Sequence, residues 1–173
     1  MDFVTELKRQ NINIRMCSQK SGIPYATLYP IIKGQVDLGT CTYNTVEKLA
    51  KVLGYRPDQI VYHKEDFQTF RNNLHHKIKN NDLQTILGII ENEDVEYYRF
   101  HSDHVKMLYL VATVDYISKK YDIPLCDKYN DIRNMKLEET FYVGDCMMIN
   151  IEKNAIEEFA KYNIMEGDLY DAV

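Results

Sequence analysis

Gly22 and Pro24, on either side of Ile23, constrain the fold more than any other feature of the sequence. Apolar residues recur at helical spacing before and after this segment. A glycine that ends a helix adopts positive φ without the steric cost that a side chain would bring. Proline favours the first position of the helix that follows. The segment therefore predicts a tight turn between two short helices, with Ile23 buried beneath the turn.

Helix-start and helix-end signals continue on both sides of this turn. The segment Cys41–Tyr43 supplies an N-cap, and Gly54 supplies a C-terminal stop. Together with the apolar spacing, these signals predict five helices over about residues 3–11, 14–21, 24–33, 43–53 and 57–60. The first 62 residues are therefore expected to form a small helical domain.

Three groups of residues in this domain carry a resemblance. They are Ser21-Gly22-Ile23-Pro24-x-x-Thr27-Leu28, Ile31-x-Lys33-Gly34 and Thr45-x-x-Lys48-Leu49-Ala50-Lys51-x-Leu53-Gly54. In type and spacing they resemble the Cro/Xre family of helix-turn-helix regulators, over about the first third of the chain. The resemblance implies a five-helix, lambda-repressor-like domain over residues 1–62. In this class the second helix of the motif enters the major groove of DNA.

The resemblance also implies which residues face DNA. The N-terminal residues of the helix that begins at Pro24 would touch base edges, and neighbouring polar residues would contact phosphates. The base-facing positions are Tyr25, Ala26 and Tyr29, the phosphate-facing ones are Thr27 and Lys33, and Lys20, Arg15 and Gln35 complete the predicted DNA-binding set.

Two positions depart from the family pattern. Pro30 stands inside the predicted third helix and lacks the N–H that would bond to the carbonyl of Ala26, so the helix is expected to bend or break near Tyr29. Ile14 stands where the family often has a phosphate-binding Gln. The base-facing surface is thus aromatic and uncharged, without the Arg, Asn or Gln pairings that read G or A. An alternative role as a dimerisation or protein-docking domain stays open.

Charge is divided unevenly along the chain. Residues 1–60 carry a net charge of +3, and residues 61–173 carry −8. A mildly basic N-terminal part and an acidic C-terminal part are consistent with a DNA-binding domain joined to a domain that does not contact DNA. No apolar run approaches the roughly 20 residues that span a bilayer, and the first residues lack a signal-peptide pattern. We therefore predict a cytoplasmic protein without a membrane segment.

Residues 63–173 are also expected to be helical, which makes the predicted fold all-α. Apolar spacing predicts helices over about 66–80, 83–90 and 101–121, then shorter ones near 130–133, 155–160 and 164–173. No period-2 strand is evident. Motifs such as Phe70-Arg71-Asn72-Asn73-Leu74, Ile123-Pro124-Leu125-Cys126 and Tyr129-Asn130-Asp131-Ile132-Arg133 resemble the tails of poorly characterised helix-turn-helix proteins of Gram-positive bacteria, some of which look like antitoxin or mobile-element regulators.

No catalytic or metal motif accompanies these helices. The sequence has no G-x-S-x-G, P-loop, G-x-G-x-x-G or H-E-x-x-H motif. The pairs His75-His76 and His101-x-x-His104 lack a third ligand at a diagnostic spacing, so they are interpreted as surface histidines. The scattered cysteines, Cys17, Cys41, Cys126 and Cys146, are expected to be free thiols. We predict neither an enzyme nor a cofactor.

Tyrosines and carboxylates crowd together just before the predicted helix over 101–121. Core packing with hydroxyls at its edge accounts for most of the tyrosines. An exposed acidic and Tyr-rich face would also suit a basic protein partner, such as a toxin. The predicted partner-binding residues are Tyr97, Tyr98, Glu93, Asp94 and Glu96.

These observations predict a sequence-specific DNA-binding transcriptional regulator of the antitoxin or mobile-element type. It would bind a double-stranded operator as a homodimer, because one small helix-turn-helix unit reads few base pairs. The alternative is an antitoxin-like interaction protein that neutralises a toxin by contact and binds DNA weakly or not at all.

Overall fold

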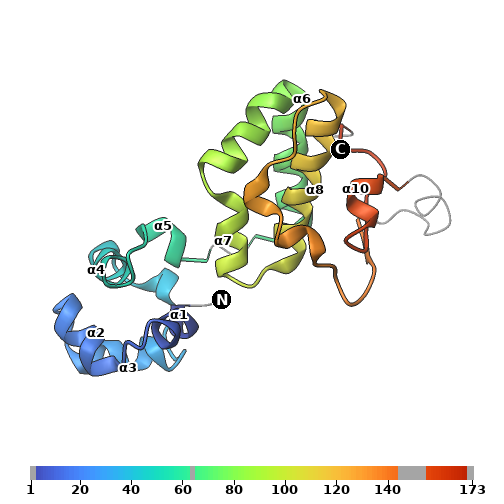
Figure 1. Ribbon diagram of the computed structural model, residues 1–173. Helices are drawn as coiled ribbons and strands as arrows, with labels where there is room; N and C mark the ends of the chain where they lie inside the picture. The colour runs from blue at the N-terminus through green and yellow to red at the C-terminus, as the bar shows by residue number, and fades with distance from the viewer. Residues whose placement is uncertain (1–2, 63–64, 144–154, 171–173) are drawn as a thin grey trace. The chain divides into compact units, whose positions relative to one another are not determined.

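The computed structural model describes residues 3–62, 65–143 and 155–170 (Figure 1). The chain divides into two units, Met1–Lys64 with Phe100–Ser102, and Glu65–Arg99 with Asp103–Val173. Apart from a two-stranded sheet, regular structure in these residues is helical, which confirms the all-α prediction. None of the described helices combines the length and the apolar character needed to cross a bilayer.

Residues 3–62 of the first unit form five α-helices and one 3-10 helix. They are α1 (Phe3–Arg9), α2 (Ile14–Ser21), α3 (Tyr25–Ile32), η1 (Leu38–Thr40), α4 (Tyr43–Leu53) and α5 (Pro57–Ile60). Their inner faces enclose a core in which Cys17, Leu28, Leu49 and Ala50 are fully buried. The order and approximate bounds of the α-helices agree with those expected from the sequence.

The turn between α2 and α3 has the predicted backbone. Gly22 adopts a φ of 68°, and its N–H donates to the carbonyl of Ser18. Ile23 is buried, and the Ser18 hydroxyl donates to its carbonyl oxygen at 2.6 Å. Pro24 is the N-cap rather than the first helical residue, since its ψ of 142° is extended. The turn therefore fixes α3 against α2 through local bonds and one apolar side chain.

Pro30 does not interrupt α3, so the expected break near Tyr29 is wrong. The helix continues through Pro30 to Ile32. The proline lies in the last turn, where it removes one hydrogen bond only, and the buried Leu28 and Ile31 hold that turn against the core. The Pro30 carbonyl accepts the N–H groups of Gln35 and Val36, which closes the end of the helix.

The second unit is built around two long helices. Its elements are α6 (Phe67–Glu91), α7 (Asp94–Phe100), α8 (His104–Lys120), η2 (Asp127–Tyr129), η3 (Ile132–Asn134), β1 (Phe141–Tyr142), α10 (Glu157–Ala160) and β2 (Ile164–Met165). A non-helical Asn81 divides α6 into two segments, close to the predicted bounds of 66–80 and 83–90. The side chain of Asn81 caps the second segment by accepting the N–H of Gln84.

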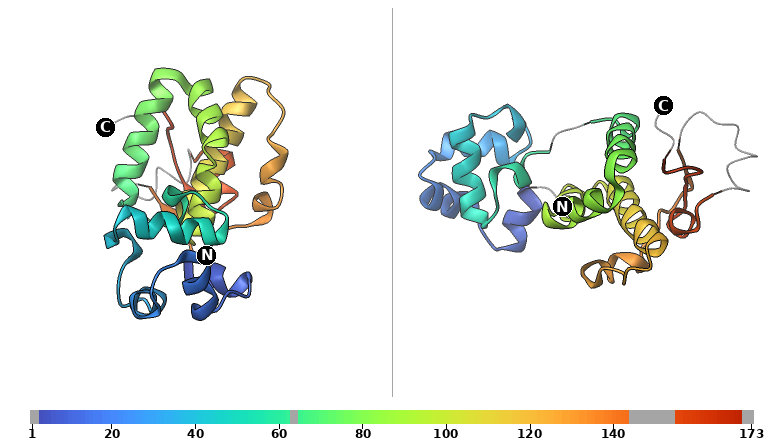
Figure 2. Two further views of the ribbon diagram at one scale, coloured as in Figure 1. Left: turned by 90° about the vertical axis from the view of Figure 1, so that its left-hand side faces the viewer. Right: turned by 90° about the horizontal axis from the view of Figure 1, so that it is seen from above.

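Helix α8 is the centre of this unit. It lies between α6 and α10 (Figure 1), and side chains all around it are buried, including Met107, Val111 and Ile117. Views from other directions show the same packing of α6 against α8 (Figure 2). Helix α7 lies between the helices predicted over 83–90 and 101–121, and its first turn contains Asp94 and Glu96.

The chain after Tyr162 differs from its prediction. Ile164 and Met165 pair in parallel with Phe141 and Tyr142 rather than beginning a last helix. The N–H of Phe141 donates to the carbonyl of Asn163 at 2.8 Å. This pairing joins segments more than 20 residues apart, so neither segment has a local pattern that reveals it. It places Glu166 directly after the strand.

Candidate functional site

The eight predicted DNA-binding residues are all exposed in the first unit. They come from α2, from α3 and from the turn after α3 (Figure 1). The set comprises Arg15, Lys20, Tyr25, Ala26, Thr27, Tyr29, Lys33 and Gln35. The packing of α2 on α3 brings them onto neighbouring helices, and none is used in the core.

The outer face of α3 carries a row of two aromatic rings and a cation. Tyr25 and Tyr29 are 46% and 40% exposed, and their ring centroids lie 6.0 Å apart. The ammonium of Lys33 lies 5.8 Å from the centroid of the Tyr29 ring. Residues four apart stand above one another on a helix, so these three side chains form one stripe. We call Tyr25, Tyr29 and Lys33 the α3 row.

The segment that contains this row has no carboxylate. Between Glu6 and Asp37 the sequence includes no Asp or Glu, while Lys8, Arg9, Arg15, Lys20 and Lys33 fall within it. Arg9 forms an ion pair with Glu6. Lys20 and Lys33 are exposed, so the α2–α3 surface is basic although the whole chain has a net charge of −5.

The first turn of α3 has backbone donors without a side-chain cap. Pro24 occupies the N-cap position and makes no side-chain hydrogen bond to the helix. The Pro24 carbonyl oxygen accepts the N–H groups of Thr27 and Leu28. The N-terminal end of a helix is electropositive and suits an anion such as a phosphate.

The predicted partner-binding face is less open than expected. Tyr98 is only 9% exposed, so its expected exposure is wrong. Its hydroxyl donates to Glu65, and burial together with that carboxylate raises the pKa of Tyr98. The sequence could not show this burial, because it depends on Phe70 of α6, whose ring meets Tyr98 edge-on.

The carboxylates beside Tyr98 bind within the unit. Glu96 and Glu93 lie 2.9 and 3.7 Å from the ammonium of Lys128. Both are partly buried, as are Asp94 and Tyr97. A basic partner would have to compete with Lys128 at this face.

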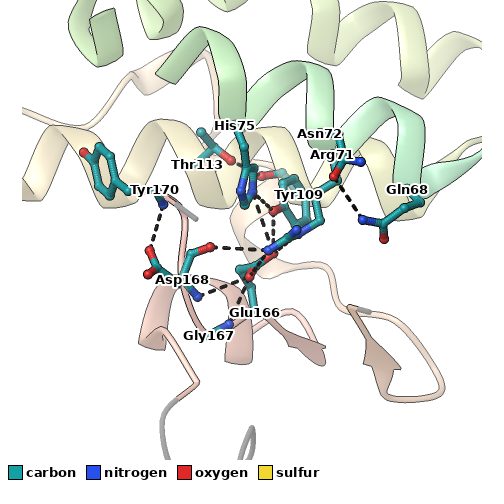
Figure 3. Close-up of polar contacts among 10 residues, drawn as sticks. All are labelled: Gln68, Arg71, Asn72, His75, Tyr109, Thr113, Glu166, Gly167, Asp168 and Tyr170. Atoms are coloured by element: carbon teal, nitrogen blue, oxygen red, sulfur yellow. Dashed lines mark hydrogen bonds and ion pairs between the residues drawn. The ribbon is translucent and has the colours of Figure 1, made fainter. Parts of the chain in front are cut away.

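A buried polar network joins α6, α8 and the segment after β2 (Figure 3). The Glu166 carboxylate is 2% exposed and accepts two bonds from the Arg71 guanidinium, at 2.7 and 2.8 Å. The hydroxyl of Tyr109 lies 2.6 Å from Glu166 and 2.7 Å from the Nε2 atom of His75. We call these four residues the Glu166 network.

The direction of the bonds in the Glu166 network follows from the proton count. Tyr109 has one hydroxyl proton, which it donates to the carboxylate, so His75 Nε2–H must donate to the Tyr109 oxygen. Burial and the adjacent carboxylate raise the pKa of Tyr109. Burial alone would lower the pKa of Arg71, but the bonds to Glu166 raise it overall. The network therefore combines the buried Arg71–Glu166 ion pair with hydrogen bonds that run from His75 to Tyr109 and from Tyr109 to Glu166.

The Glu166 network lies in the interior and links α6, α8 and the segment after β2. All four residues are buried, and the backbone N–H groups of Gly167 and Asp168 also donate to Glu166. Sequence reasoning missed these residues and interpreted His75 as a surface residue, which is wrong. One signal was available: Arg71, Leu74, His75 and Ile78 share one face of α6 by their spacing.

The other histidines and the cysteines that the structure describes do not form a cluster. His104 is exposed, His101 Nε2 donates to the Gln59 carbonyl oxygen at 2.8 Å, and Asp103 caps α8. Within the described ranges, no three His, Cys, Asp or Glu side chains are grouped to hold a metal ion. Cys17, Cys41 and Cys126 are free, and Cys146 lies outside the described residues.

The resemblance of the first unit to the Cro/Xre family depends on the motifs quoted above. Comparisons of the chain with protein-family models, with curated proteins and with solved structures found no match.

Proposed function

We propose that this protein is a sequence-specific DNA-binding regulator that contacts double-stranded DNA through the α2–α3 surface. The proposal depends on one observation above the others: this surface exposes three basic side chains, Arg15, Lys20 and Lys33, and residues 14–33, which form it, include no carboxylate. Such a surface is attracted to the phosphate backbone. The α3 row and the uncapped first turn of α3 then supply a helix face and an anion-binding end at the same place.

Dimerisation and regulation belong to the same proposal. A single unit of this size reads too few base pairs for useful specificity, and dimers bind half-sites about 34 Å apart. The acidic second unit would supply the contact between protomers and the binding of a partner. As for the antitoxin-like regulators that the second half resembles, that partner would be a toxin.

Binding to the promoter upstream of its own gene tests this function. Few phosphates are neutralised per protomer, so the slope of log affinity against log salt should be shallow, on the order of −4 to −6 for a dimer. Lys33→Glu should weaken binding at least tenfold. Lys77→Glu, an equal charge change at an exposed position of α6, should leave binding unchanged. Absence of binding at low salt would contradict the proposal.

A second function is favoured by the apolar character of the same surface. Tyr25, Tyr29 and Val36 are exposed large side chains, and exposed aromatics are frequent in protein interfaces. In this alternative the first unit docks a protein, such as a toxin. Tyr29→Ala would then abolish capture of that protein, and the Lys33→Glu variant would bind DNA no differently from the wild type.

A further inference from the structure

We propose that the two tyrosines of the α3 row read the 5-methyl groups of thymines in the major groove. Operator half-sites would then be thymine-rich where they face α3. This inference rests on the proposed DNA-binding function and goes beyond it, because it names the base and the chemical group that are recognised.

The side chains available on α3 favour this group. Guanine and adenine are read by bidentate pairing with Arg, Lys, Asn or Gln, and thymine by apolar contact with its methyl group. The exposed residues in the first two turns of α3 are Tyr25, Ala26, Thr27 and Tyr29. Ala26 and the two rings offer apolar surface, and Thr27 offers a methyl group as well as a hydroxyl. None of these can make a bidentate pair with a purine.

The residues that could make such pairs lie elsewhere. Gln35 follows Gly34, beyond the end of α3, and its backbone N–H bonds to the Pro30 carbonyl, so it belongs to the closing turn. Arg15 belongs to the first turn of α2. Lys33 stands at the end of the row, over the Tyr29 ring, where its ammonium can reach a phosphate while the ring faces the groove.

The spacing of the two rings suits a groove edge. Their centroids are 6.0 Å apart, and both rings remain 40% or more exposed without a cover in the first unit. Each ring can therefore cover a methyl group on a different base step, since successive base pairs are about 3.4 Å apart along one strand. Burial of a methyl group in such a contact is the chief gain in affinity that an uncharged ring can provide.

The test removes one methyl group at a time from the DNA. Duplexes bound by the full chain are first selected from a random-sequence library, which needs no prior operator. Each thymine of the selected half-site is then replaced by uracil, which keeps the base pair and the O4 acceptor but lacks the methyl group. Affinity should fall about fourfold at each thymine that α3 contacts.

Protein variants test whether the tyrosine rings cause the fall in affinity that follows replacement of thymine by uracil. Tyr25→Ala and Tyr29→Ala should each remove the thymine-over-uracil preference at one position, and Tyr29→Phe, which keeps the ring, should retain it. Tyr43→Ala is the matched control, because Tyr43 is 70% exposed but belongs to α4. It should change the affinity for thymine and uracil duplexes equally. Thermal unfolding checks that each variant is folded.

The outcomes separate this inference from the function on which it rests. If no duplex is selected at low salt, the proposed DNA binding fails. If duplexes are selected but every uracil replacement leaves affinity unchanged, DNA binding stands and thymine reading is overturned. Loss of the preference in Tyr29→Phe would assign the reading to the hydroxyl and would also overturn the inference.

Discussion

At the scale of single residues, Glu166 combines a buried carboxylate with several hydrogen bonds. Its buried carboxylate accepts bonds from Arg71, from Tyr109 and from two backbone N–H groups. A buried charge is tolerated only when it is paired and hydrogen-bonded. Loss of one partner of such a pair is costly, whereas replacement of both by apolar groups is often neutral.

We therefore expect Glu166→Gln to lower the free energy of unfolding by about 3–5 kcal/mol, because it leaves the buried Arg71 without its counter-ion. The double variant Arg71→Met, Glu166→Leu should recover much of this loss. Urea unfolding at neutral pH measures both. Glu157→Gln, at an exposed position of α10, is the control and should change stability by less than about 0.5 kcal/mol. Additive losses in the double variant would contradict the assignment of a coupled ion pair.

At the scale of elements, α3 shows that a proline near a helix end has a small effect. Pro30 removes the partner of the Ala26 carbonyl, yet the turn that follows is helical because Leu28 and Ile31 are buried. The outward face of the helix therefore continues from Tyr25 to Lys33. This continuity is what aligns the α3 row.

Replacement of Pro30 by Gln should restore that hydrogen bond and stabilise the first unit by about 1 kcal/mol. Because the helix already passes through Pro30, the thymine preference of the α3 row should be unchanged. Thermal unfolding and the affinity for thymine and uracil duplexes measure the two effects. If stability rises but the preference for thymine over uracil is lost, Pro30 is needed for the arrangement of the α3 row, which would contradict this expectation.

Asp82 joins three elements of the second unit. At the kink in α6 it accepts bonds from Lys120 at the end of α8, and from Tyr121 and Tyr170. Burial opposes its ionisation, but these bonds lower the pKa of Asp82 from 3.8 to about 2. A carboxyl whose pKa is lower in the folded state stabilises the fold above its unfolded pKa and loses that effect as pH falls.

The contribution of Asp82 should thus be complete above about pH 5 and disappear towards pH 2. Asp82→Asn should lower stability by about 1–2 kcal/mol at pH 7 and flatten the acid dependence between pH 4 and pH 2. Urea unfolding across this range gives both quantities. Asp122→Asn, at an exposed carboxylate just beyond α8, should leave the profile as in the wild type. An unchanged profile in Asp82→Asn would contradict the role given to Asp82.

At the scale of the whole molecule, charge is divided between the two parts of the chain. The first unit is basic on its α2–α3 surface, while residues 61–173 carry −8. The second unit also exposes apolar side chains in the segment after α8, namely Tyr121, Ile123 and Leu125. Apolar residues grouped in a short exposed segment are typical of interfaces.

We predict that this segment contributes to a homodimer. Light scattering should show a dimer at tens of micromolar protein, and the variant Ile123→Asp, Leu125→Asp should be monomeric and bind operator DNA at least tenfold more weakly. Leu87→Asp, at another exposed apolar position of the second unit, is the control. A monomeric wild type, with and without DNA, would contradict the prediction.

The sequence by itself determined most of the helices. Their ends depend on local chemistry: Gly22 and Gly54 adopt positive φ, and Thr42 and Asp66 accept the N–H groups of the first turns that follow them. Such bonds form between residues three or four apart, so a pattern in the chain reveals them.

Only the tertiary structure decided the rest. Arg71 and Glu166 are 95 residues apart, and β1 and β2 are more than 20 residues apart. A pattern within a short stretch of the sequence therefore cannot predict either contact. The burial of His75 and Tyr98 depends on partners in other elements, Tyr109 and Phe70. A polar side chain can be buried wherever a distant partner satisfies its hydrogen bonds. Packing between elements determines that partner. For this reason the sequence predicts His75 and Tyr98 at the surface, whereas both are buried in the fold.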